Sequence, residues 1–130
     1  MIGLDTNVLV RYIAQDDAKQ SSIATKVIES QCSADQPGFI ATVTLVELVW
    51  VVESCYGATR RDISAIVRQI LESKQLLVQS AEAVWQALYA FESGPADFAD
   101  CLIERLAFAA GCSHTVTFDK AAARAGMQLL

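Results

Sequence analysis

The chain has 130 residues, 53% of them hydrophobic, so its length predicts one domain and its composition excludes a largely disordered protein. Its 15 acidic residues outnumber its 10 basic residues and give a formal net charge of −5, which argues against binding nucleic acid through bulk positive charge. The same charge leaves two possibilities open, an acidic site that requires a metal ion and a basic partner protein.

Short apolar runs alternate along the chain with longer segments in which apolar residues recur at helical spacing. The helix over residues 45–56 is expected to have Thr44 as its N-cap and to end at Gly57. In chain order we expect a strand over 2–4, helices from Thr6 and over 17–32, a strand over 39–41, helices over 45–56 and from Thr59, a strand over 76–78, helices from Ser80 to about Ser93 and over 97–110, a strand over 114–118, a short helix over 121–125 and a last strand over 127–130.

This alternation is typical of an α/β fold, in which helices cover both faces of a parallel sheet. We therefore predict a single domain over residues 1–130. In such sheets ligands bind at the carboxyl ends of the strands. Asp5 and Asp119 directly follow predicted strands, whereas Glu47, Asp97 and Asp100 lie in the first turns of helices that follow loops. The predicted topology brings these distant acids to one edge of the sheet.

Asp5, Glu47 and Asp119 have an alternative interpretation as residues that cap a helix. Asp5 and Asp119 each precede a predicted helix, where an aspartate commonly serves as N-cap. Thr44 and Glu47 have the spacing of a capping box, in which each side chain bonds to the backbone N–H of the other residue. Glu47 is surrounded by apolar residues, however, and a buried carboxylate needs a partner or a metal ion.

Asp97 and Asp100 lie one helical turn apart and share a helix face. Two like charges at this spacing repel each other unless a cation lies between them. The alternative is that both favour the positive end of the helix dipole, an interpretation that suits Asp97 as N-cap. It suits Asp100 less well, because this residue lies deeper in the helix among apolar neighbours.

The acids as a set predict a metal site, because clustered carboxylates repel each other unless cations neutralise them. Oxygen ligands without cysteine or histidine suit Mg²⁺ or Mn²⁺. A metal-bound water can attack phosphorus near neutral pH. The sequence contains no nucleophile elbow, phosphate-binding loop or dinucleotide-binding glycine motif. The single histidine, His114, lies in a predicted strand and is interpreted as structural.

The remaining features indicate a cytoplasmic protein. No apolar run reaches the roughly 18 residues that a membrane span needs. An acid at position 5, with no basic leader before it, argues against a signal peptide. The four cysteines form no CxxC pair, and we interpret them as reduced core thiols: Cys32, Cys55, Cys101 and Cys112.

Four segments carry a family resemblance when taken in order. They are Leu4-Asp5-Thr6-Asn7-Val8-Leu9, Thr44-Leu45-Val46-Glu47, Ala96-Asp97-Phe98-Ala99-Asp100-Cys101-Leu102-Ile103 and Thr115-Val116-Thr117-Phe118-Asp119. Together they resemble the PIN-domain nucleases, and most of all the VapC toxins of bacterial toxin–antitoxin pairs. The resemblance implies a PIN-like fold, a three-layer α/β/α sandwich with a short, mostly parallel central sheet.

The resemblance also implies an endoribonuclease that depends on Mg²⁺ or Mn²⁺. Family members typically form homodimers and are inhibited by a cognate antitoxin protein. Asp5, Asp100 and Asp119 would hold one or two metal ions, while Glu47 orients the attacking water or shares a metal. The residues implied for the site are Asp5, Glu47, Asp100 and Asp119 as catalytic acids, Asp97 as an auxiliary metal ligand, and Asn7 and Thr117 as supporting polar residues.

Few basic residues are available to bind the RNA. Arg11 and Lys120 stand near the predicted acids and could hold phosphate, whereas Arg60 and Arg61 have the alternative of being solvated charge. Arg124 is a further candidate.

Two other functions would suit a chain of this size and fold class. A phosphoryl-accepting, receiver-like domain would need an aspartate at the end of the strand over residues 76–78, and none is there. A catalytically silent PIN-like binding module remains the alternative, although the complete acid set favours catalysis.

Overall fold

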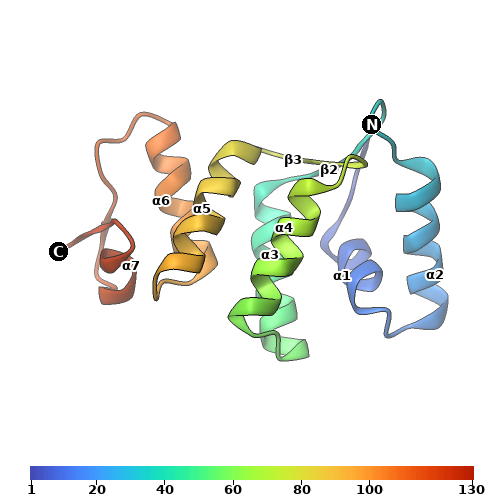
Figure 1. Cartoon of the computed structure of the whole chain (residues 1–130), viewed down its shortest axis with the longest axis horizontal. Coiled ribbons are helices and arrows are strands. Elements are labelled where there is room, and N and C mark those ends of the chain that lie inside the picture. Colours follow the sequence, from blue (N-terminus) through green and yellow to red (C-terminus); the bar gives the residue numbers. More distant parts are fainter. The chain divides into compact units, whose positions relative to one another are not determined.

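The computed structural model describes the whole chain, Met1 to Leu130, as two compact units, Met1–Gln79 and Ser80–Leu130 (Figure 1). Each unit contains its own short parallel sheet. The sequence predicted one sheet, so this detail was wrong. The strands are only two or three residues long, so each sheet depends on a few backbone hydrogen bonds and on the helices around it.

The first unit is built on three parallel strands in the order β1-β2-β3. Ile2 pairs with Gly38, and Phe39 pairs with Leu77. A Cβ atom added at Gly38 would lie 2.7 Å from Leu4 Cδ1 and 3.1 Å from Cys32 Sγ, so a larger residue here would require these buried side chains to shift. The strands are β1 (Ile2–Gly3), β2 (Gly38–Ile40) and β3 (Leu76–Val78).

Helices pack around this sheet and bury an aliphatic core. The predicted helix over residues 17–32 is an α-helix that continues into one π-helical turn. The helices are α1 (Thr6–Ala14), α2 (Ala18–Lys26), the π turn η1 (Val27–Gln31), α3 (Thr42–Tyr56) and α4 (Arg60–Glu72), and the fully buried residues are Leu9, Ile28, Ile40, Leu45, Leu48, Ile63 and Val67.

Helix α3 begins three residues earlier than predicted. Its N-cap is Ala41, so the expected capping box between Thr44 and Glu47 does not form. The amide oxygen of Gln79 instead accepts a hydrogen bond from the backbone N–H of Thr42, at 3.0 Å. The helix ends as predicted at Gly57, whose φ of 66° favours glycine.

Thr59 begins helix α4 as predicted. The Thr59 hydroxyl accepts a bond from the N–H of Asp62 at 3.1 Å, and the Asp62 carboxylate accepts one from the N–H of Thr59 at 2.9 Å.

We expect Thr59→Ala to lower the free energy of unfolding by about 1 kcal/mol, the usual cost of losing an N-cap. Urea denaturation measures this change. Ser22→Ala, at an exposed position of α2, is the control and should change it by less than about 0.5 kcal/mol; equal losses would refute the assignment.

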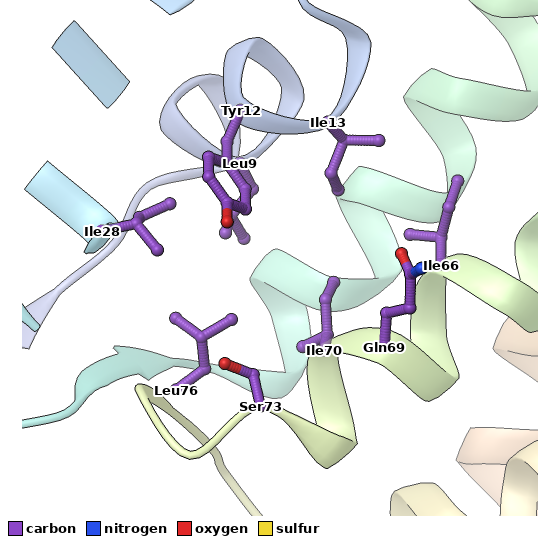
Figure 2. Close-up of a pocket in the computed structure, with 9 residues that line it drawn as sticks. All are labelled: Leu9, Tyr12, Ile13, Ile28, Ile66, Gln69, Ile70, Ser73 and Leu76. Carbon is purple, nitrogen blue, oxygen red and sulfur yellow. The ribbon is translucent and has the colours of Figure 1, made fainter. Parts of the chain in front are cut away.

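A pocket of about 290 Å³, partly open to solvent, lies in the first unit. Figure 2 shows side chains from α1, α4 and β3 converging on it. Its lining is mainly aliphatic, and none of the predicted site acids contributes to it. The residues around it are Leu9, Tyr12, Ile13, Ile28, Ile66, Gln69, Ile70, Ser73 and Leu76.

The second unit pairs two long helices beside a two-stranded parallel sheet. Helices α5 and α6 lie side by side (Figure 1) and meet through Phe91 and Phe98, whose rings are in edge-to-face contact 6.0 Å apart. Val116 pairs with Gln128 in the sheet. The elements are α5 (Ala81–Ser93), α6 (Phe98–Ala109), β4 (Val116–Thr117), α7 (Lys120–Arg124) and β5 (Gln128–Leu129).

Some local predictions were wrong. Strand β4 is shorter than predicted, so His114 lies before it, exposed, with its Nδ1 3.0 Å from the Ser113 hydroxyl. All four cysteines are free, but only Cys32 and Cys101 are buried. Cys55 is exposed near the C-terminal end of α3, and Cys112 is exposed in the loop after α6. None of the helices is both long and apolar enough to cross a membrane.

Candidate functional site

Asp5 lies at the junction of β1 and α1. It occupies the N-cap position of α1 with an extended backbone, yet its side chain makes no capping hydrogen bond. Its backbone carbonyl accepts bonds from the N–H groups of Val8 and Leu9, which complete the first helical turn. The exposed carboxylate is therefore not needed as a cap.

Glu47 is held by a residue that our sequence analysis did not select. Its Oε1 accepts a hydrogen bond from the hydroxyl of Thr6 in the first turn of α1. Thr6 is buried, and Glu47 is exposed rather than enclosed by its apolar neighbours, as we had expected. Thr6 could have been selected from the sequence. It lies on the same core-facing side of α1 as Leu9 and Val10 and is the polar residue among them.

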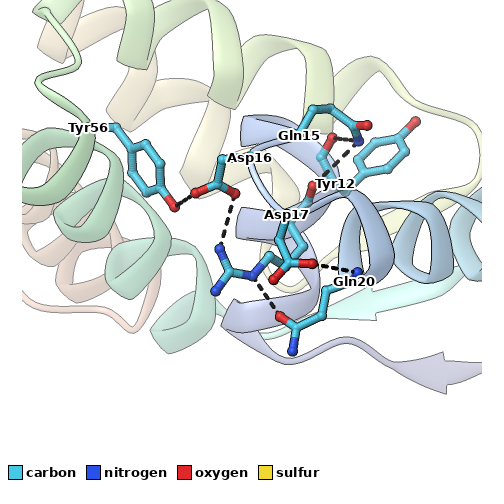
Figure 3. Close-up of polar contacts among 7 residues, drawn as sticks. Tyr12, Gln15, Asp16, Asp17, Gln20 and Tyr56 are labelled. Atoms are coloured by element: carbon cyan, nitrogen blue, oxygen red, sulfur yellow. Dashed lines mark hydrogen bonds and ion pairs between the residues drawn. The ribbon is translucent and has the colours of Figure 1, made fainter.

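Arg11, a predicted phosphate-binding residue, is engaged within the protein. Its guanidinium lies 3.0 Å from a carboxylate oxygen of Asp16 and donates to the Gln20 side-chain oxygen at 2.8 Å. The hydrogen bond to Asp16 raises the pKa of Arg11. Figure 3 shows Tyr56 donating to the same Asp16 carboxylate, at 2.6 Å. The hydrogen bond from Tyr56 lowers the pKa of Asp16, and the bond from Arg11 lowers it further.

Asn7, the predicted supporting residue, is exposed on α1. It lines a shallow apolar pocket of the first unit together with Arg11 and Ile23.

Asp97 caps helix α6. Its carboxylate accepts a hydrogen bond from the backbone N–H of Asp100 at 2.8 Å, as the cap interpretation predicted. One carboxylate oxygen is therefore committed to the helix, and the side chain is exposed. Such a cap leaves other lone pairs of the carboxylate available.

Asp100 is half-buried in the first turn of α6. Burial raises its pKa above the usual aspartate value, and the negative charges of Asp97 and Asp119 raise it further. The deprotonated form is therefore disfavoured by its surroundings. A cation bound beside Asp100 would reverse this effect, because an opposite charge favours the ionised carboxylate.

Asp119 follows β4 and caps the short helix α7. Its Oδ1 accepts hydrogen bonds from the N–H groups of Ala121 at 2.7 Å and Ala122 at 3.1 Å. The hydroxyl of Thr117 accepts a bond from the backbone N–H of Asp119 at 3.0 Å and so fixes the turn. Lys120, the predicted phosphate-binding residue, is exposed at the start of α7.

The chemistry of these donors fits Mg²⁺ or Mn²⁺, since they are carboxylate oxygens with no sulfur or imidazole among them. In neither unit do three acidic, histidine or cysteine side chains lie in an arrangement that could hold an ion by themselves. The local feature that favours a cation is the mutual repulsion of Asp97, Asp100 and Asp119.

Comparisons with known proteins agree with the resemblance found in the four motifs. A family model described as PIN domain matches residues 2–127. A VapC ribonuclease of Aquifex aeolicus (strain VF5) is 26% identical over 117 residues, which cover 90% of this chain and 86% of that protein. The helices and short parallel sheets fit the predicted PIN-like α/β/α fold.

Proposed function

The chain belongs to the PIN-domain family, and on this basis we propose that it is a metal-dependent endoribonuclease that hydrolyses RNA phosphodiesters. The similar VapC ribonuclease supports the substrate class. The observation that carries the proposal is the match of the PIN-domain model to residues 2–127. The acidic neighbours of Asp100, which raise its pKa, support it, because a bound cation would offset their repulsion.

Each acid has a proposed role. Asp5, Asp100 and Asp119 act as ligands for one or two Mg²⁺ or Mn²⁺ ions, and Asp97 is an auxiliary ligand. Glu47 accepts a hydrogen bond from the attacking water and directs it in line with the scissile bond. When bound, the metal lowers the pKa of water and stabilises the charge that develops on the phosphate oxygens.

The remaining predicted residues support this chemistry. Asn7 and Thr117 keep the neighbouring carboxylates in place by hydrogen bonding, and Thr117 already bonds the backbone of Asp119. Lys120 is exposed next to Asp119 and holds a substrate phosphate. Arg11 does the same after exchanging its bond with Asp16 for a phosphate oxygen.

The partners follow from the same family membership. We propose that the protein is the toxin of a toxin–antitoxin pair in the cytoplasm, that it forms a homodimer, and that a cognate antitoxin inhibits it.

Asp5→Asn tests the proposed nuclease site. Purified protein should cleave a mixed RNA pool with Mg²⁺ or Mn²⁺, and EDTA should stop the reaction. Asp5→Asn should lower the rate by at least about 100-fold, since losing even an outer partner of a metal ligand costs about 10- to 100-fold. Electrophoresis of the RNA with time measures the rate.

Asp35→Asn is the matched control, an exposed aspartate in the loop before β2, and should cleave like the wild type. A folded, inhibitor-free wild type that cuts no RNA would favour the silent binding module instead. Cleavage that persists in EDTA would contradict the role of the metal.

A further inference from the structure

Thr6 places a hydroxyl group on the buried face of α1, whose other buried residues, Leu9 and Val10, are apolar. The residue is 5% exposed. A buried hydroxyl is costly unless it finds a hydrogen-bond partner. The partner that it has is Glu47, 41 residues further along the chain. The polar group at this core position is therefore directed at one acid of the proposed site.

Both ends of this contact are held firmly. The backbone before Thr6 is fixed by the N–H of Leu4, which donates to the Phe39 carbonyl at 2.9 Å. Leu45 and Leu48, on either side of Glu47 in helix α3, are completely buried. The long side chain of Glu47 is exposed and would otherwise sample several rotamers. Threonine, branched at Cβ, presents its hydroxyl in a restricted set of directions.

The junction of β1 and α1 thus serves two acids of the first unit at once. Asp5 presents its own carboxylate to solvent, and the next residue turns inward to the carboxylate of Glu47. We propose that Thr6 is a positioning residue, whose hydroxyl holds the Glu47 carboxylate in the orientation that directs the attacking water. This inference rests on the proposed function and adds to it a residue outside the predicted acid set.

Thr6→Val tests the proposal, because valine keeps the shape and removes the hydroxyl. We expect kcat for RNA cleavage to fall about 10- to 100-fold, the usual loss for an outer partner of a metal-site group, with KM for RNA nearly unchanged. Thr6→Ser keeps the hydroxyl and should retain most of the activity. Circular dichroism and thermal melts establish that both variants are folded.

A double-mutant cycle separates positioning from a general structural role. If Thr6 acts through Glu47, adding Thr6→Val to Glu47→Ala, which removes the accepting oxygen, should cost much less than it costs in the wild type. Full additivity, a Thr6→Ser variant as slow as Thr6→Val, or an undiminished kcat in Thr6→Val would each overturn the proposal. A wild type that cuts no RNA would overturn the nuclease function itself, and the role of Thr6 with it.

Discussion

Asp100→Asn is expected to abolish RNA cleavage and, at the same time, to raise the melting temperature of the metal-free protein. If Asp100 is a metal ligand as proposed, the loss of rate should be at least about 100-fold, since losing even an outer partner of a metal ligand costs about 10- to 100-fold. The gain in stability follows from the raised pKa of Asp100, which shows that its charged form is disfavoured by burial and by Asp97 and Asp119. Like charges one turn apart cost a few tenths of a kcal/mol, so we expect a rise of about 1–3 °C.

The raised pKa of Asp100 also predicts how the stability gain of Asp100→Asn changes with pH. The folded protein binds a proton at Asp100 more tightly than the unfolded chain does, so ionisation of Asp100 lowers stability as the pH rises. The advantage of Asp100→Asn should therefore be present at neutral pH and shrink under acidic conditions, where Asp100 becomes protonated. Melts in EDTA at several pH values measure it. Asp35→Asn is again the control, and an unchanged or lower melting temperature in Asp100→Asn would contradict the electrostatic argument.

Phe98→Ala is expected to lower the free energy of unfolding by about 3–5 kcal/mol, the usual cost of truncating a buried phenylalanine. Phe98 is 1% exposed, and its ring is in edge-to-face contact with that of Phe91 at a centroid distance of 6.0 Å. The substitution leaves a cavity between α5 and α6 and removes this aromatic contact. Urea denaturation followed by circular dichroism measures the loss.

Phe118→Ala is the matched control from the same unit. Its side chain is 84% exposed, so the same truncation should change the free energy of unfolding by less than about 0.5 kcal/mol. If both variants lost stability equally, the assignment of Phe98 to the core would be wrong. Because Phe98 lies between Asp97 and Asp100 in the sequence, the core residue also anchors the helical turn that carries both acids.

Local chemistry made many features predictable. Helical spacing and short apolar runs predicted the type and order of the elements, because burial repeats every 3.6 residues in helices. Thr59 as the start of α4 and Gly57 as the end of α3 were predicted correctly, since caps depend on residues close in sequence. The cap alternatives also proved correct for Asp97 and Asp119, whose carboxylates accept backbone N–H bonds in their own helices.

What the sequence alone determined, then, is the family, the acids at strand and helix junctions, and most of the elements. The choice of distant partners was decided only by the tertiary structure. Glu47 bonds Thr6 rather than the nearby Thr44, and Thr42 is capped by Gln79 from the end of β3. In the sequence, many residues could serve equally well as hydrogen-bond partners for the Glu47 carboxylate or the Thr42 N–H. Packing of the buried helices against the strands selects one partner by bringing it within hydrogen-bonding distance. The spacing of apolar residues in the sequence predicts which face of a helix is buried, but not which distant residue that face will meet.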